Sequence, residues 1–187
     1  MALLAPPALA AGRRLLVAGL MCLLLSAAPA QTASREYQIK AVFLFNFTQF
    51  VEWPAASFPD SRAPLVIGVL GNDPFGALLE TAIRNERAGE HPLEIRRFQN
   101  AAQADCHVLF ISRSEGARLE AILSALADKP ILTVSDTDNA ARRGVMIRFL
   151  SENNRIRIRI NLDSAKRAGL TISSKLLRSA EIVRRAP

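Results

Sequence analysis

The sequence predicts a single-domain α/β sandwich, with a mostly parallel sheet, flanking helices and an antiparallel C-terminal hairpin. Over the first two thirds of the chain, short continuous apolar runs alternate with helical patterns, as expected for parallel strands that are buried on both faces. The last third instead carries two alternating segments around a short polar turn. With 187 residues, the chain is long enough for one buried core.

Residues 1–30 are predicted to be a secretory signal peptide, and residues 31–187 the exported domain. An Arg13-Arg14 pair precedes an apolar stretch over residues 15–25, and an Ala-Pro-Ala motif ending at Ala30 offers a cleavage site. As a helix the apolar stretch spans about 16 Å, which is short against a bilayer core of about 30 Å. An uncleaved anchor is the alternative.

The exported domain is predicted to open with a helix over residues 34–52, which Ser34 caps and a Trp-Pro pair ends. One stripe of this helix should pack on the sheet: Ile39, Phe43, Phe47 and Phe50. Val42 and Phe45 point away from that stripe. The face around Phe45 is therefore covered either by a second element or by another chain.

Strands and helices should then alternate. The strands are expected at residues 64–70, 93–98, 108–111 and 131–134. A helix over residues 74–87 should have Asp73 as its cap and Pro74 at its first position. A further helix is expected over residues 114–127, because its leucine and isoleucine side chains fall on one face.

The pattern changes in the last third. Residues 145–150 and 155–162 are predicted to form the antiparallel hairpin. Asp163 should cap a short helical turn that Gly169 ends, and residues 173–185 should form a terminal helix.

The positive charge is concentrated at the C-terminal end. Residues 142–187 hold 12 basic and 3 acidic side chains, whereas residues 31–141 hold 10 and 14. This asymmetry indicates an anionic contact at one end. Export argues against nucleic acid as the partner. Arg155, Arg157 and Arg159 alternate with isoleucine and share one strand face, which is either solvated or a docking face for anions.

The residue inventory predicts no catalytic residue, no metal and no cofactor. The sequence holds no zinc-protease, thiol-redox, nucleophile-elbow or phosphate-loop motif. His91 and His107 are expected to be structural rather than general bases. Cys106 is the lone cysteine of residues 31–187 and leads into an apolar run. It is expected to be a buried thiol, with pairing between chains as the alternative.

Polar residues follow the strands, and ligands of open α/β sheets bind outside the carboxyl ends of strands. The residues expected to rim one crevice there are Asn72, Asp73, Ser112, Ser114, Ser135 and Asp136. Each can equally serve as a turn or cap residue, so a small-ligand pocket and ordinary capping both stay open. Asp136 and Asp138 alone supply too few ligands for a divalent cation.

The chain resembles the YfiR family over nearly the whole exported domain. The segments that carry the resemblance are residues 36–47, 50–54, 67–76, 106–112, 132–136, 160–163, 168–170 and 172–177. The resemblance implies a periplasmic, non-enzymatic homodimer that represses a membrane-bound diguanylate cyclase, or a related inner-membrane sensor, by binding its periplasmic part. It also implies relief by an outer-membrane lipoprotein. Disulfides help the family's namesake, but a lone Cys106 cannot form one within the chain.

Three functions follow as hypotheses. The favoured one is a regulator that contacts its partner through Phe45, Asn46 and the face of Arg155, Arg157 and Arg159. The alternative is a small-ligand receptor without a catalytic role, which uses the predicted crevice. An enzyme that uses the same crevice is the third.

Overall fold

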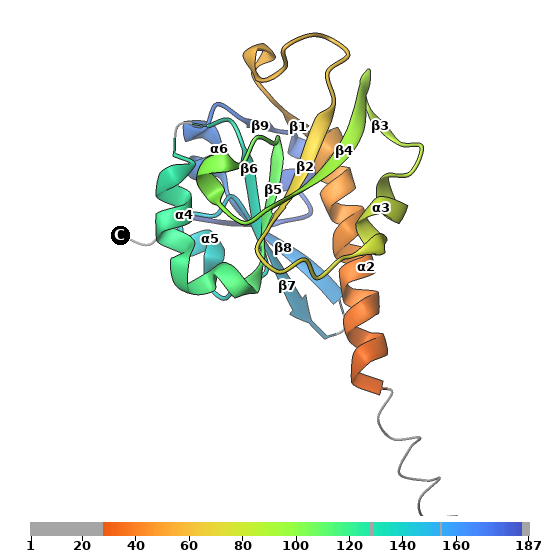
Figure 1. The fold of residues 1–187 in the computed structure, drawn as a ribbon. Coiled ribbons are helices and arrows are strands. Elements are labelled where there is room, and N and C mark those ends of the chain that lie inside the picture. Colours follow the sequence, from red (N-terminus) through yellow and green to blue (C-terminus); the bar gives the residue numbers. More distant parts are fainter. Residues whose placement is uncertain (1–27, 128, 154, 185–187) are drawn as a thin grey trace, which may run out of the picture. The chain divides into compact units, whose positions relative to one another are not determined.

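The computed structural model describes residues 28–127, 129–153 and 155–184 (Figure 1). Glu36–Pro187 form one compact unit, and Met1–Arg35 form another. Most of the predicted signal peptide, residues 1–27, lies outside the described residues, so that assignment stays a prediction. Residues 28–30 are helical.

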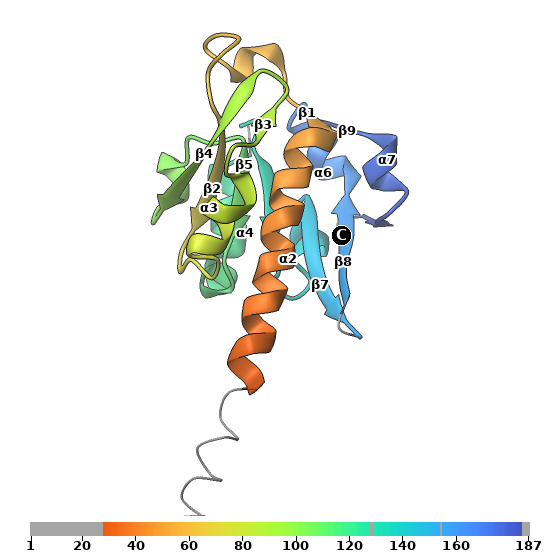
Figure 2. The ribbon, with the colours of Figure 1, turned by 90° about the vertical axis from the view of Figure 1, so that its right-hand side faces the viewer.

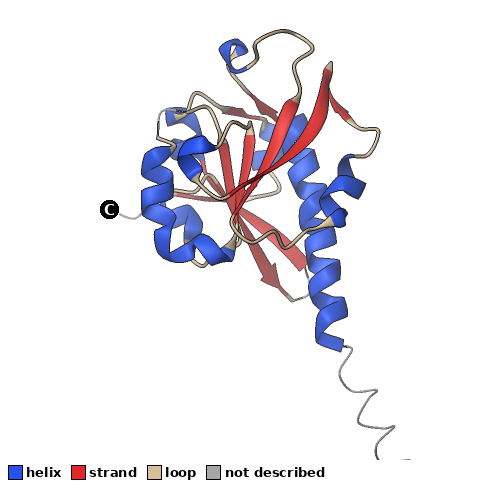
Figure 3. Ribbon diagram, viewed as in Figure 1, coloured by secondary structure: helices blue, strands red, loops and turns tan. Residues whose placement is uncertain are grey.

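Within the described residues, eight strands form one mixed sheet in the order β10-β8-β7-β6-β5-β2-β4-β3 (Figure 3). They are β2 (Leu65–Leu70), β3 (Arg87–Ala88), β4 (His91–Phe98), β5 (Val108–Ile111), β6 (Leu132–Ser135), β7 (Ile147–Glu152), β8 (Arg155–Asn161) and β10 (Glu181–Val183). The pairs from β4 through β2, β5 and β6 to β7 are parallel, and so is β8 with β10. The β7–β8 pair is antiparallel, as is β3–β4. The predicted α/β class, with a mostly parallel sheet and an antiparallel C-terminal hairpin, is confirmed.

A second, small sheet joins two distant segments. β1 (Val51–Glu52) pairs antiparallel with β9 (Thr171–Ile172), and Ser173 N–H donates to the Phe50 carbonyl at 2.8 Å. The first helix therefore ends at Phe50 rather than at Glu52, because the next two residues find their backbone partners in β9.

The helices lie on both faces of the large sheet (Figure 2). They are α2 (Ala28–Phe50), α3 (Ala77–Ile83), α4 (Leu119–Ala125), α5 (Ala140–Arg143), α6 (Leu162–Arg167) and α7 (Ser174–Leu177), with short 3-10 helices at Ala55–Ser57, Ala101–Gln103 and Arg113–Arg118. One apolar core joins α2, α3, α6 and α7 to the sheet, and a second joins α4 and α5 to the opposite face. Because strand side chains alternate, Ile67 belongs to the first core and Val66 to the second.

The helix predicted over residues 74–87 is wrong at both ends. Asp73 Oδ1 accepts from the N–H groups of Phe75 and Gly76 and so stabilises a turn instead of the helix. Gly76 has φ +49°, a left-handed conformation that favours glycine, and α3 begins only after it. Asn85, with φ +63°, follows the end of α3.

One cap and the bounds of two helices in the second half also need correction. Ser112 caps a 3-10 segment, and α4 begins only at Leu119. Asn161, not Asp163, caps α6, since its side chain accepts from Ser164 N–H at 3.0 Å. The predicted terminal helix stops at Leu177, and the chain turns into β10 because its backbone pairs with the open edge of β8.

The buried face of α2 is rotated away from the predicted stripe. Ala41, Leu44 and Phe47 are fully buried, as is Lys40, whereas Ile39 is 37% exposed. The predicted stripe included Ile39 and left out Lys40. Because its ammonium is paired inside the protein, Lys40 joins the buried face and Ile39 moves to the surface.

Candidate functional site

The exposed side of α2 carries an apolar stripe. Ile39 and Val42 are 37% and 47% exposed, and they lie three residues apart, so their side chains are neighbours on the helix surface. Phe45 continues the stripe and Asn46 adjoins it; both are half-buried. Phe45 belongs to neither apolar core. The sequence placed Val42 and Phe45 off the packed stripe but named Phe45 and Asn46, not the more exposed Val42, as candidate contacts.

The arginine face of β8 alternates as predicted. Ile158 and Ile160 are buried, while Arg155 and Arg157 are exposed. Arg159 Nε lies 2.7 Å from the Glu181 carboxylate, and Arg157 Nε lies 3.9 Å from that of Glu152. Part of the positive charge is therefore balanced locally.

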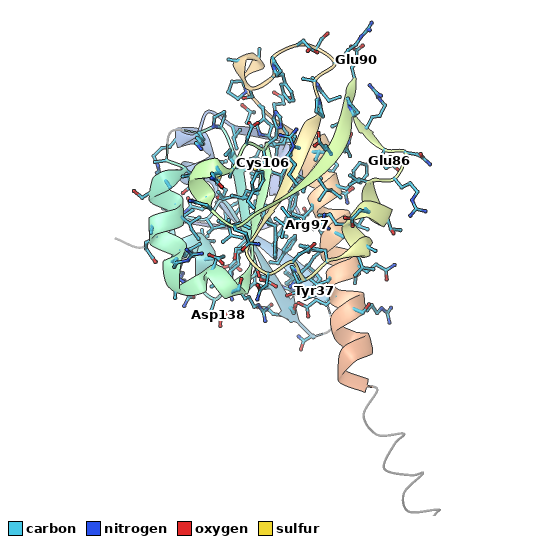
Figure 4. All side chains as sticks on the ribbon, in the orientation of Figure 1. Tyr37, Glu86, Glu90, Arg97, Cys106 and Asp138 are labelled. Carbon is cyan, nitrogen blue, oxygen red and sulfur yellow. The ribbon has the colours of Figure 1, made fainter. Side chains whose placement is uncertain are left out.

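A buried charge cluster closes the carboxyl edge, by which we mean the edge of the sheet where β2, β5 and β6 end. Lys40 Nζ lies 2.6 Å from Asp136 Oδ2 and 2.5 Å from Glu36 Oε1. Tyr37 donates to the same Asp136 oxygen at 2.9 Å. Arg113 Nε lies 3.4 Å from Asp136 Oδ1, which is buried and accepts no hydrogen bond among the described residues. Figure 4 places Tyr37 at this end of the sheet and Cys106 toward the other.

The cluster shifts the titration of its partly exposed members. Partial burial raises the pKa of Glu36, but hydrogen bonds from Lys40 and Ser151 and the charges of Lys40 and Arg113 outweigh it, so the net pKa is lowered. Burial, reinforced by the charge of Asp136 and by the hydrogen bond to it, raises the pKa of Tyr37 above its usual range. Glu36 is therefore ionised at neutral pH, and the Tyr37 phenol keeps its proton.

The predicted crevice residues all lie near the carboxyl edge, and several have structural partners. Ser135 is fully buried; its hydroxyl donates to the Ile111 carbonyl at 2.8 Å and accepts from Thr137 N–H. Ser114 Oγ accepts from Asn72 N–H at 3.0 Å. Asp73 Oδ2 accepts from Arg97 Nε at 2.8 Å. Their role in ligand binding stays a prediction.

Two further predicted crevice residues, Ser112 and Asp136, also make contacts within the protein at the carboxyl edge. Ser112 is buried and accepts a long hydrogen bond, 3.4 Å, from Ser114 N–H. Asp136 is the hub of the buried cluster. Sequence reasoning missed its partner Lys40, although one signal was available: Glu36 and Lys40 are spaced i, i+4 inside an apolar helix.

The opposite, amino edge, where β2, β5 and β6 begin, holds a cavity of about 360 Å³. It is lined by Ala56, Ser57, Ala102, Gln103, Ala104, Asp105, Cys106, His107, Lys129, Pro130 and Ile131. Cys106 is buried, as the sequence predicted. Burial raises the pKa of its thiol to about 12, so the thiol is protonated at neutral pH. Burial likewise lowers the pKa of His107.

Among residues 28–127, 129–153 and 155–184, no group of three or more His, Cys, Asp or Glu side chains is placed to hold a metal ion. Over the same ranges, no helix combines the length and the apolar composition that crossing a membrane requires.

The protein is thus an α/β domain: one large sheet is covered by helices on both faces, and one of these helices carries an exposed apolar stripe. A model of the YfiR/HmsC-like family matches residues 37–181, and the chain belongs to that family. A search of curated proteins found no match. The family is periplasmic and regulatory rather than catalytic, and membership supports a periplasmic regulator role with a membrane-associated partner in general.

Proposed function

We propose that this protein is an exported regulator that represses a membrane-bound signalling enzyme, a diguanylate cyclase or a related inner-membrane sensor, by binding its periplasmic part. The observation that carries the proposal is the apolar stripe of Ile39, Val42 and Phe45 on α2. Water contact with such a stripe is unfavourable by about 25 cal/mol per Å² of apolar surface, and a partner relieves it.

The stripe is suited to binding because its helix is firmly anchored on the other side. Leu44 and Phe47 are fully buried, and Phe47 stacks on Phe149 of β7 with ring centroids 5.8 Å apart. Lys40 fixes the same helix through its buried ion pair with Asp136. A rigid helix loses little conformational entropy on binding, which favours affinity.

The arginine face gives the partner a second contact. Arg155 and Arg157 are exposed on the side of β8 that faces away from α2. A partner with an acidic surface would be drawn to this side by charge, and mutations here should affect the association rate and its salt dependence more than the final affinity.

Repression follows from differential binding. A regulator lowers the output of a sensor only when it binds the sensor's inactive state more tightly than its active state. A tenfold preference corresponds to about 1.4 kcal/mol. An outer-membrane lipoprotein that competes for the same stripe would relieve the repression. A homodimer through the stripe or through residues 155–158 of β8, the part of the hairpin edge that β10 leaves unpaired, belongs to the same proposal.

The test is capture of the partner from solubilised inner membranes with the tagged protein, followed by mass spectrometry. We expect an inner-membrane protein with a diguanylate cyclase or kinase output domain. A Val42→Arg variant should lose it, and a Ser124→Arg variant, which adds the same charge to the exposed side of α4, should retain it. Equal recovery by both variants would refute the stripe as the contact.

The small-ligand receptor is the second candidate, and the amino-edge cavity is the observation that favours it. Its lining combines apolar side chains with Lys129, Asp105 and Ser57. Ser57 Oγ is buried and has no hydrogen-bond partner among the described residues. A thermal-shift screen with nucleotides, amino acids and muropeptides tests this function. No shift at millimolar ligand would argue against it.

A further inference from the structure

The segment between β1 and β2, residues 53–63, is fastened to the amino edge; we call it the strap (Figure 1, the loop at the top). Trp53 Nε1 donates to the His107 carbonyl at 3.1 Å. His107 Nε2 lies 3.1 Å from the Ser57 carbonyl, and His91 Nδ1 lies 2.7 Å from the Ala63 carbonyl. Two histidines from outside the strap thus hold its backbone at two points.

The hydrogen bonds of His107 fix its protonation state. Val66 N–H donates to Nδ1 at 3.0 Å, so Nδ1 carries no proton. The proton of the neutral ring must then lie on Nε2, where it is donated to the Ser57 carbonyl. The neutral ring satisfies both partners. A cationic ring cannot, because its Nδ1–H would point at the Val66 N–H.

One phenylalanine of the strap lies between both histidines of the chain. The Phe58 ring stacks on His91 at a centroid distance of 4.0 Å and on His107 at 4.4 Å, with 16° between the planes in each pair. Two rings cannot occupy the same space, so the histidines lie on opposite faces of Phe58. The sequence contains two histidines in all, and both are used here.

We propose that His107 is a proton-operated latch for the strap. At neutral pH the uncharged ring holds Ser57 and Phe58 on the amino edge. Protonation of Nδ1 sets its new N–H against the Val66 N–H, so the ring must move out of its place. The hydrogen bond to the Ser57 carbonyl and the stack on Phe58 are lost with that movement, and the strap opens. Ala56 and Ser57 line the 360 Å³ cavity together with Cys106 and His107, so opening of the strap removes one wall of that cavity.

The charges around the ring set the direction of the effect. Burial, His91 and Arg96 on β4 lower the pKa of His107, whereas the Ser57 carbonyl and Asp105 raise it; the net shift is downward. Lys129 lines the same cavity, and Asp60 and Arg62 lie on the strap itself. A histidine whose pKa is lower in the closed state stabilises that state above its ordinary pKa near 6.5. This stabilisation is lost as the pH falls below 6.5 toward the pKa of the closed state.

His91 differs from His107 and provides a matched control. Its Nδ1 faces a carbonyl, so it donates there, and it continues to donate when the ring is protonated. Protonation of His91 therefore leaves the strap attached. The latch requires that the pH response follow His107 and not His91.

Trp53, the one tryptophan of the chain, reports on the strap directly, since its ring lies edge-on to His107 with centroids 6.1 Å apart. We would titrate its fluorescence in the purified protein from pH 8 to pH 5 and record the far-ultraviolet circular dichroism alongside. The expected result is a fluorescence change below pH 6.5 at constant dichroism, with the opening equilibrium rising about tenfold per pH unit where it is steepest.

The variants decide the assignment. His107→Asn keeps an acceptor for Val66 N–H but does not titrate, so its signal should be independent of pH in this range. His91→Asn should retain the transition. Loss of the transition in His91→Asn, its persistence in His107→Asn, or loss of dichroism at the same pH would each overturn the proposal.

One measurement needs no variant and holds even where His107→Asn fails to fold. The imidazole ¹⁵N chemical shifts of His107 in the wild-type protein report which nitrogen carries the proton. At pH 7.5 the latch requires the Nε2–H form. An Nδ1–H form, or an unchanged His107 spectrum between pH 7.5 and pH 5, would overturn it.

Discussion

The two edges of the sheet are closed by contacts of opposite kinds, one charged and one uncharged. At the carboxyl edge, α2 is held to β6 by formal charges, with Lys40 between Asp136 and Glu36. At the amino edge, the strap is held by an uncharged ring, that of His107. Both contacts bring distant segments together, but one needs ionised side chains and the other needs a neutral one.

The difference teaches which edge can respond to its surroundings. The Glu36 carboxylate beside Lys40 stays ionised down to acidic pH, since its pKa is lowered from 4.5. The His107 ring, whose pKa burial lowers, is neutral at pH 7 and takes up a proton on acidification. Mild acid should therefore open the amino edge and leave α2, with its apolar stripe, in place.

The largest effect is expected from Lys40→Met, which breaks the carboxyl edge. The change leaves Asp136 buried without its ammonium partner, and it should lower the free energy of unfolding by about 3–5 kcal/mol. Urea denaturation at pH 7 measures this. Lys40→Met combined with Asp136→Leu should recover most of the loss, because it removes both charges; no recovery would mean that the pair is not the main interaction.

Ser135→Ala tests whether a predicted crevice residue is structural. Its hydroxyl satisfies both the Ile111 carbonyl and Thr137 N–H in a buried position. Its loss should cost about 1–2 kcal/mol of stability in urea denaturation. A change below 0.3 kcal/mol, together with a lost response to a ligand in thermal shift, would instead assign Ser135 to a binding site.

Trp53→Phe weakens the amino edge without changing its charge. It removes the hydrogen bond to the His107 carbonyl and keeps an aromatic ring. The free energy required to open the strap should fall by about 1 kcal/mol. This change should be seen as faster hydrogen exchange of residues 53–63 at pH 7.5. Exchange at the carboxyl edge should stay unchanged; equal acceleration at both edges would show that the edges are not independent.

Glu36→Gln gives the smallest effect and sharpens the contrast in pH dependence. A carboxyl whose pKa is lowered by folding adds stability above its ordinary pKa of 4.5 and loses it as the pH falls through the folded value. The variant should thus be less stable by about 0.5–1 kcal/mol at pH 7, and the difference from wild type should shrink as the pH falls below 4.5. A difference that appears between pH 7 and pH 5 instead would contradict the charge assignment.

The sequence predicted the architecture better than the sites. Continuous apolar runs such as residues 65–70 mark buried parallel strands whatever their partners are, because both faces of the sheet are covered. The hairpin was predicted equally well, since residues 155–160 alternate strictly between arginine and isoleucine. The ends of the helices were not predicted, because Gly76 and Asn161 act through backbone conformation and tertiary contacts that single-residue preferences do not contain.

The contacts that close the two edges could not be predicted from local sequence patterns. Lys40 and Asp136 are 96 residues apart, and a lysine on an apolar helix is normally a solvent residue. His107 was expected to be structural, which it is, but its stacking on Phe58 depends on a loop with no periodic signal. For the candidate partner surface, the sequence named Phe45 and Asn46, and the exposure of Val42 adds a third residue on the same side of α2. That this surface binds a partner stays a proposal.

The most direct test of the account is the affinity of the protein for the periplasmic part of the membrane protein that it captures. We predict that Val42→Arg weakens binding at least tenfold, about 1.4 kcal/mol, because it places a charge in the apolar contact. Ser124→Arg should bind as the wild type does. Wild-type affinity of Val42→Arg, or an equal loss in both variants, would contradict the assignment of α2 as the regulatory surface.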